Sequence, residues 1–311
     1  MKLNYIKNFI QNSNAKSKVL NYTIIVRTHN KFFSAKSRFI FNNGLVKLPH
    51  FSKIEKGGED ALVANESIIC VSDGVGGWAE EGVDPAKYSN ELCENIKKSF
   101  IVFSQNNLYH QPKKIFIEAA NKTLSKGSAT CCLCILDLEK NYLHTLNLGD
   151  SGYLILRPSI KNDRPVNGRN EDNLKNDNQA TGNKLEIIYK SEEQTHGFNF
   201  PFQVGTFGDD PSTAQTKIHE IRENDLIVLG TDGLWDNLFE KQIIQVIQTH
   251  LKNSPVIQDL SVVAKDLGQT AENLSHSQNY NSPFAVRSGG QFIGGKPDDI
   301  TIIVSQIIKK L

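Results

Sequence analysis

Short apolar runs that end beside acidic residues recur along this chain. Each run has the length and composition of a buried strand, and each carries its carboxylate at one end. A strand that ends in this way places the carboxylate at the rim of its sheet. The runs and their acidic residues are 68–71 with Asp73, 146–148 with Asp150, 226–229 with Asp232, and 300–304 with Asp298.

The remaining pattern predicts helices in pairs and strands in runs. Asp84 followed by Pro85 is a good helix start, and apolar residues at a helical period follow Pro112. The predicted helices are 85–104, 112–124, 239–251 and 256–274. The predicted strands are 68–72, 129–138, 142–148, 152–156, 185–189, 216–221, 226–230 and 300–307.

This order of elements favours an α+β fold over an alternating βαβ fold. The short link 139–141 suits a hairpin, so we expect antiparallel sheets. Two antiparallel sheets packed face to face, with a helical pair on each outer side, accommodate all the predicted elements. The expected architecture is a four-layer αββα sandwich.

Composition divides the chain into three parts. Residues 1–42 form a basic N-terminal extension, and residues 43–311 form one folded domain. Within that domain, residues 158–184 are polar and carry almost no apolar side chains, so we expect a disordered insert there.

Charge is distributed unevenly behind a formal net charge of +1. Residues 1–54 contain ten Lys or Arg and no Asp or Glu, which leaves 25 basic against 34 acidic residues in the rest. An acidic body argues against nucleic-acid binding. No apolar stretch reaches the roughly 18 residues of a membrane helix. The basic extension resembles an organelle transit peptide. We expect a mitochondrial location, with a plastid or the cytoplasm as alternatives.

The five cysteines do not form a metal-binding or disulfide pattern. Their spacing lacks paired zinc-ligand motifs, and an odd number argues against a disulfide framework. We expect them to serve as small apolar core residues. They are Cys70, Cys93, Cys131, Cys132 and Cys134.

Carboxylates gathered at strand ends repel one another unless cations compensate them. Oxygen ligands of this kind suit magnesium, manganese or calcium. If Asp73, Asp232 and Asp298 meet, they can hold two divalent ions about 4 Å apart. A water shared by two such ions loses its proton near neutral pH and can attack a phosphate ester in line.

Six ordered motifs resemble the metal-dependent protein phosphatase 2C family, and the details around them are similar to its compact PTC-seven branch. That resemblance spans about residue 43 to the C-terminus. The motifs begin at Glu59-Asp60-Ala61, Val71-Ser72-Asp73-Gly74, Gly127-Ser128, Gly149-Asp150-Ser151, Asp232-Gly233-Leu234-Trp235-Asp236 and Asp298-Asp299-Ile300-Thr301.

The resemblance implies hydrolysis of phosphoserine and phosphothreonine in phosphoprotein substrates by a hydroxide that bridges two Mg²⁺ or Mn²⁺ ions. It implies catalytic and metal-binding roles for Asp73, Asp232 and Asp298, with the Gly74 carbonyl as a further ligand. It also implies water-mediated ligands at Glu59 and Asp60, and a weaker third ion at Asp150 and Asp236. We expect a monomer.

Two positions depart from the family pattern. Val75 stands where many members have a histidine proposed to protonate the leaving group, and valine cannot donate a proton. Glu55 stands where the family has a phosphate-binding arginine, with Lys56 beside it as a weak substitute.

Other local features have structural explanations. His196 either lines the substrate cleft or makes a structural hydrogen bond, and the second is favoured. We expect Phe198, Phe200 and Phe202 to anchor the core or a loop. Residues 290–296 imitate a phosphate-binding loop, but Pro297 and a following strand argue against that function.

Two alternative functions remain open. A pseudophosphatase would bind phosphoproteins or a scaffold without turnover, as Val75 and Glu55 suggest. A phosphatase acting on small molecules is the narrower alternative. The retained aspartates favour an active protein phosphatase.

Overall fold

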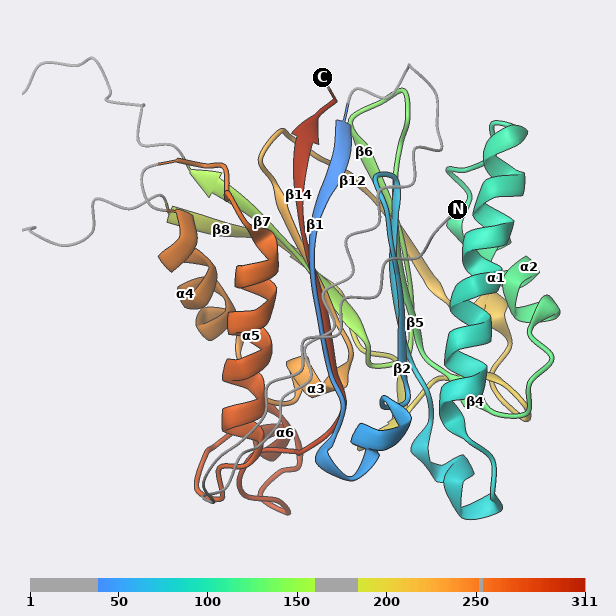
Figure 1. The fold of residues 1–311 in the computed structure, drawn as a ribbon, viewed down its shortest axis with the longest axis vertical. Helices are drawn as coiled ribbons and strands as arrows, with labels where there is room; N and C mark the ends of the chain where they lie inside the picture. The colour runs from blue at the N-terminus through green and yellow to red at the C-terminus, as the bar shows by residue number, and fades with distance from the viewer. Residues whose placement is uncertain (1–38, 160–183, 252–253, 311) are drawn as a thin grey trace, which may run out of the picture.

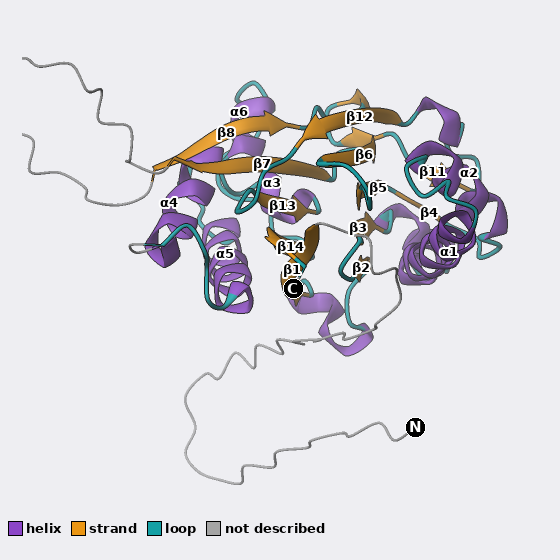
Figure 2. Cartoon of the chain, turned by 90° about the horizontal axis from the view of Figure 1, so that it is seen from above, coloured by secondary structure: helices purple, strands orange, loops and turns teal. Residues whose placement is uncertain are grey.

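The computed structural model describes residues 39–159, 184–251 and 254–310. Two five-stranded antiparallel sheets stack face to face, and a pair of helices covers each outer side (Figure 1). Figure 2 shows the four layers from above, with α4 and α5 on one side and α1 and α2 on the other. The expected αββα sandwich is confirmed.

The first sheet has the order β1 (Phe39–Leu48), β14 (Ile300–Lys309), β13 (Leu226–Gly230), β7 (Gly152–Ser159) and β8 (Lys184–Lys190). The second has the order β12 (Gln215–Glu220), β6 (Tyr142–Leu148), β5 (Cys131–Leu136), β3 (Ile68–Asp73) and β2 (Asp60–Ala64). Two short pairs join β4 (Ser128–Ala129) with β11 (Val204–Gly205), and β9 (Thr195–Gly197) with β10 (Phe200–Pro201).

The helices are α1 (Pro85–Gln105), α2 (Pro112–Lys122), α3 (Asp232–Trp235), α4 (Glu240–Leu251), α5 (Leu260–Ser275) and α6 (Pro283–Arg287). Three 3-10 helices are η1 (Phe51–Lys56), η2 (Gly76–Glu81) and η3 (Pro211–Thr213). Among the described residues, no helix is both long and apolar enough to cross a membrane.

Local sequence explains where the longest helix starts and how it packs. The Asp84 carboxylate accepts a hydrogen bond from the Ala86 backbone N–H at 3.2 Å and caps α1. Leu92, Ile96 and Phe100 recur every four residues and are buried against the second sheet. The predicted start of this helix is therefore confirmed.

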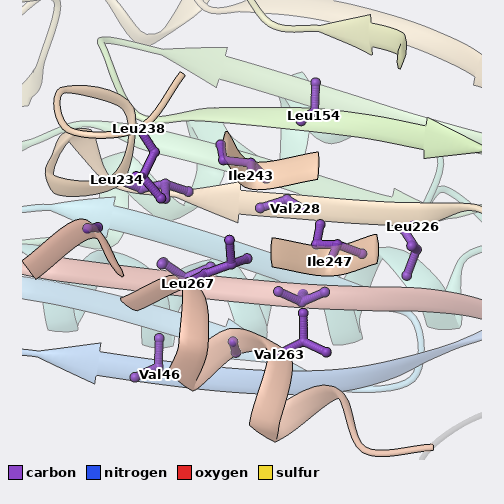
Figure 3. Close-up of a cluster of buried hydrophobic side chains, with 14 of the residues drawn as sticks. Val46, Leu154, Leu226, Val228, Leu234, Leu238, Ile243, Ile247, Val263 and Leu267 are labelled. Carbon is purple, nitrogen blue, oxygen red and sulfur yellow. The ribbon is translucent and has the colours of Figure 1, made fainter. Parts of the chain in front are cut away.

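Three apolar clusters separate the four layers. One lies between the first sheet and helices α4 and α5 (Figure 3), where Val228 of β13 packs with Ile247 and Val263. A second lies between the second sheet and helices α1 and α2. The third fills the space between the sheets. All five cysteines are free and buried, as expected of small core residues.

On one face of β3, every second side chain points into the apolar cluster between the sheets, and this face continues to the end of the strand. Ile69 and Val71 belong to the cluster between the sheets. Successive side chains in a strand alternate, so the next residue on that face is Asp73. Asp60 of β2 is its cross-strand partner. The fold thus delivers two carboxylates to the end of the apolar space between the sheets.

The pattern did not predict β1 and β2 of the two main sheets, nor the short strands β9, β10 and β11. β1 begins at Phe39, before the expected domain start at residue 43, and pairs along its length with β14. β2 precedes β3 as the edge of the second sheet. The expected insert falls almost entirely outside the described residues, because β7 ends at Ser159 and β8 begins at Lys184.

Candidate metal centre

Carboxylates from separate parts of the chain converge at one end of the sandwich. Asp60 and Asp73 face each other across β2 and β3, while Asp232 begins α3 directly after β13. Asp298 lies just before β14. A hydrogen bond of 2.8 Å from Thr231 Oγ1 to Asp60 Oδ2 connects the two sheets at this point.

Burial and mutual repulsion make this cluster difficult to charge. Burial, followed by the charge of Asp60 and of neighbouring aspartates, raises the pKa of Asp73 well above its usual range. Burial and then Asp299 raise the pKa of Asp60 to about 8. Burial raises the pKa of Asp298 to about 6, with Asp232 as the next cause. These carboxylates need added positive charge if all are to be ionised near neutral pH.

Lys296 supplies part of that charge from within the chain. Its ammonium contacts Asp232 and lies 2.8 Å from Asp236 and 3.5 Å from Asp298. Burial lowers the pKa of Lys296, but the surrounding carboxylates outweigh this effect and raise it well above its usual value. Burial likewise raises the pKa of Asp232, but Lys296 reverses the effect and holds that pKa below its usual value.

A second lysine enters the cluster from η1. Lys53 Nζ lies 2.5 Å from Glu59 Oε2, 3.7 Å from Asp298 Oδ1 and 3.4 Å from Asp299 Oδ2. Asp299 is almost fully buried and accepts the backbone N–H groups of His50 and Glu59, at 2.6 and 2.7 Å. Asp299 therefore fixes η1 and the start of β2 against the acidic end of β14.

Asp150 and Asp236, the pair that the resemblance implies for a weaker third ion, also lie close to Lys296. Burial raises the pKa of Asp236 to about 6, with Lys296 and Arg287 opposing that change. Arg287 of α6 donates to Asp236, and its guanidinium lies 3.5 Å from Glu193. Burial, then repulsion from Asp232, raises the pKa of Asp150. The predicted third site is therefore already partly neutralised by protein cations.

Three oxygens show that the cluster fits divalent cations. Asp60 Oδ1, Asp150 Oδ1 and Asp232 Oδ1 are buried, and none has a hydrogen-bond partner. Buried carboxylate oxygens are costly without partners, and hard cations such as magnesium and manganese prefer oxygen ligands. The donor set therefore matches these ions.

In this structure the described carboxylates do not surround a single position where an ion could bind. Within the described ranges, no three His, Cys, Asp or Glu side chains are placed so that they could hold a single ion. The ammonium of Lys296 lies among Asp232, Asp236 and Asp298 instead. Ion binding at Asp232 requires this ammonium to move away or the carboxylate to turn.

Two glycines allow these segments to pack closely. A Cβ atom at Gly74 would lie 2.7 Å from the Pro85 carbonyl oxygen and 2.8 Å from that of Glu59. A Cβ atom at Gly233 would lie 2.1 Å from the Asp299 carbonyl oxygen. Both glycines are therefore required by backbone packing around the cluster, independently of any ion.

The two departures from the family pattern have different surroundings. Val75 is half-buried directly after the Asp73-Gly74 pair, and its backbone N–H donates to the Ser128 carbonyl at 3.0 Å. Glu55 and Lys56 are exposed on η1, and no ion pair joins either of them to the described cluster. The η1 residue that forms ion pairs with the acidic cluster is Lys53, which was not predicted from the sequence.

His196 makes the structural hydrogen bond that was expected. Its Nε2 lies 2.9 Å from Asp209 Oδ1, and its ring stacks on Phe202 at a centroid distance of 4.2 Å. It also lines a cavity with Val75 and Trp78. Phe198 anchors a loop by packing against Phe284 of α6, with ring centroids 4.9 Å apart.

Sequence reasoning missed the cations and one buried acid of this site. Lys296 was set aside with the imitation phosphate-binding loop, although its position two residues before Asp298 was a usable signal. Asp299 was visible as the second member of an Asp-Asp pair. Lys53 and Arg287 carried no recognisable signal, because each belongs to a short helix.

Comparison with known proteins identifies related chains. The family model "Protein phosphatase 2C" matches residues 199–279. The "Protein phosphatase PTC7 homolog" of Danio rerio is 32% identical over 267 residues, which cover 80% of each chain. "Probable protein phosphatase 2C 55" of Arabidopsis thaliana is 33% identical over 85% of this chain but 51% of the relative. The chain thus spans about half the length of that plant relative.

Solved structures share the fold. The "X-ray structure of the photosystem II phosphatase PBCP" has a TM-score of 0.70 and 28% identity, and covers 86% of this chain and 98% of that one. The catalytic domain of the serine threonine protein phosphatase PstP "in complex with 2 Manganese ions" has a TM-score of 0.53 and 15% identity, with coverage of 87% and 99%.

Proposed function

Because this chain belongs to the protein phosphatase 2C family, we propose that it is a metal-dependent protein serine/threonine phosphatase. The observation that carries the proposal is the buried acidic cluster with unpartnered oxygens on Asp60, Asp150 and Asp232. Divalent cations would stabilise the ionised form of a buried acidic cluster of this composition. The fold that it shares with a structure holding two manganese ions supports the same conclusion.

The proposed ligands divide by their place in the cluster. Asp73, Asp232 and Asp298 would hold two Mg²⁺ or Mn²⁺ ions directly, and the Gly74 carbonyl would add a backbone oxygen. Glu59 and Asp60 would contribute through water. Once bound, the ions would lower the pKa of a water molecule and polarise the phosphate group.

A weaker third ion is proposed at Asp150 and Asp236. Asp236 already receives Lys296 and Arg287, so an ion there must compete with two protein cations. That competition gives a physical reason for weak binding. We therefore expect the third ion to bind only at high metal concentration.

Protein residues would position the substrate phosphate. Lys53 is part-exposed beside Asp298 and would have to turn from Glu59 towards a phosphate group bound at the cluster. Glu55 occupies the position of the family's phosphate-binding arginine. We propose that Lys53, rather than Lys56, provides positive charge for the phosphate in its place. Val75 cannot protonate the leaving group, so that proton must come from solvent or another residue.

Phosphate release from a phosphoserine peptide tests the proposal. Wild-type protein with Mn²⁺ should release phosphate, and a chelator should stop the release. Binding of the peptide with no metal-dependent release would favour the pseudophosphatase alternative, for which Val75 is the supporting observation. Release from small phosphate esters alone would favour the small-molecule alternative.

The domain and cellular assignments remain predictions. Residues 43–311 are proposed as the catalytic domain and residues 1–42 as a mitochondrial targeting extension, of which residues 39–42 also belong to β1. Residues 1–38 lie outside the described part of the chain. A fluorescent fusion of residues 1–42 that fails to reach mitochondria would contradict the targeting proposal.

A further inference from the structure

A cavity of about 880 Å³ opens beside the acidic cluster and has no role in the proposed chemistry. Its wall includes Asp298 and also Gly58, the residue before Glu59. Cavities of roughly 300–1,000 Å³ are typical of small-molecule and side-chain binding sites. This cavity therefore adjoins the proposed phosphate position and is large enough for a side chain.

The cavity is mainly apolar. It lies between η1, the end of β1, the first turns of α1, the C-terminal end of α5 and the segment that leads into β14. Figure 1 shows η1, in blue, at the same end of the sandwich as α3 and α6. The apolar residues that line it are Leu48, Pro49, Phe51, Ile54, Pro297 and Ile300.

The polar groups around the cavity do not form an anion site. Lys47 Nζ is engaged by the Asp60 carbonyl at 2.7 Å. Lys56 lies next to Glu55, and His276 follows Glu272 by four residues at the end of α5, so basic and acidic groups are mixed in the lining. A second phosphate or an acidic side chain would meet carboxylates here. The lining instead favours an uncharged apolar group.

We propose that this cavity binds a large apolar side chain flanking the phosphorylated residue of a protein substrate. The inference rests on the proposed phosphatase function and specifies its substrate class. An extended peptide advances about 3.3 Å per residue. With phosphate held at Asp298, a residue one to three positions away can therefore reach the cavity that Asp298 helps to line.

Two neighbouring cavities are less suited to this occupant. A cavity of about 410 Å³ beyond Asp236 is lined by charged residues that include Glu193 and Arg287. Another of about 630 Å³, beside Trp78 and His196, is more polar in its lining than the cavity at η1 and lacks a proposed metal ligand in its wall. The cavity at η1 combines apolar walls with direct continuity to Asp298.

Paired phosphopeptides test the proposal. The peptides are identical except for Leu or Ser at one of the three positions on either side of phosphoserine. Full-length wild-type protein with Mn²⁺ should show a kcat/KM about tenfold higher for Leu at one or more positions, as expected for an apolar side chain entering a pocket. Hydrolysis of p-nitrophenyl phosphate, which has no flanking residues, reports separately on the metal site.

Substitution of the cavity wall provides the second arm. Ile54→Ser should bring the Leu-to-Ser preference close to one, and Phe51→Ser at the rim should reduce it in the same direction. Both side chains are exposed at 39% and 69%, so neither change removes core packing. Ile218→Ser, at an exposed site of β12 that does not line the cavity, is the matched control and should keep the wild-type preference.

The outcomes distinguish this inference from the proposed function. Wild-type hydrolysis of p-nitrophenyl phosphate without any Leu preference would overturn the cavity assignment alone. A preference that persists in both Ile54→Ser and Phe51→Ser would also overturn it. Absence of metal-dependent hydrolysis of every substrate would overturn the phosphatase proposal, and the inference with it.

Discussion

The ammonium of Lys296 lies 2.8 Å from the Asp236 carboxylate, inside a cluster whose acidic residues come from both sheets. The same ammonium contacts Asp232 at the start of α3. A single lysine therefore forms ion pairs with the carboxylates at both ends of that short helix. This contact gives the cluster a protein cation that must share its carboxylates with any bound ion.

Lys296→Met should destabilise the metal-free protein. The change leaves Asp232 and Asp236, both buried, without their shared cation, and breaking a buried ion pair costs about 3 kcal/mol. Urea unfolding in chelator measures the loss. Added Mn²⁺ should recover more stability in the variant than in wild type, because the ion no longer competes with the lysine.

Lys309→Met is the control for that experiment. Lys309 pairs with Glu223 at 2.5 Å, and both side chains are largely exposed, so the loss should be below about 1 kcal/mol. An equal effect of Mn²⁺ on wild type and Lys296→Met would show that the lysine and the ions do not compete.

Asp73→Asn should separate activity from stability. The variant should lose turnover by about a thousandfold or more, because the central carboxylate is removed. Because the pKa of Asp73 is raised in the folded state, this carboxyl destabilises the metal-free fold increasingly as pH rises above its unfolded value of 3.8. The variant should therefore unfold at the same or a higher temperature in chelator. Activity within tenfold of wild type would refute the assigned role.

His219 should make stability depend on pH. Burial, and secondly the charge of Lys217, lower the pKa of His219 from 6.5 to about 4. Since the folded-state pKa is depressed, the stabilising contribution is complete above pH 6.5 and is lost as pH falls towards 4. The half-buried position reduces the expected loss between pH 7.5 and 5 to about 1 kcal/mol.

Urea unfolding of wild type and His219→Gln at both pH values measures this contribution. His219 Nε2 lies 2.8 Å from the Tyr153 hydroxyl, and glutamine keeps a polar group there without titrating. The difference between the two proteins should shrink at the lower pH. An identical pH dependence of the unfolding free energy in both proteins would show that His219 does not contribute to it.

Arg157 should be important for the stability of the sheet end opposite the acidic cluster. Its Nε and Nη2 atoms each lie 2.8 Å from the fully buried Asp225 carboxylate. Arg157→Met leaves that charge unpaired and should cost about 3 kcal/mol in urea unfolding at pH 7. Arg157→Met combined with Asp225→Asn should recover part of this loss, and no recovery would argue against the ion pair as its cause.

Apolar runs predicted the strands that are buried on both faces. The run 68–71 placed Asp73 at a strand end, and the run 226–229 did the same for Asp232 in the other sheet. β1 was missed because Gly44, beside two asparagines, resembles a turn. It instead lies inside the strand, where a Cβ atom would come 2.0 Å from the Leu260 backbone of α5.

The cations of the site could not be found in the same way. Lys53 lies on a 3-10 helix of six residues and Lys296 in a loop, where no repeating pattern fixes the direction of a side chain. Their contacts depend on how η1 and the segment before β14 meet Asp298 in three dimensions. The acidic residues at the strand ends were therefore predictable from sequence, whereas the contacts that Lys53 and Lys296 make with them required the fold.

Anomalous scattering from crystals soaked in Mn²⁺ tests the central claim most directly. The account predicts two strong peaks that share the Asp73 carboxylate, with Asp232 and Asp298 as further ligands and Lys296 Nζ displaced from Asp232. Peaks only at other sites, or none at saturating manganese while Lys296 stays in place, would contradict the proposed metal centre.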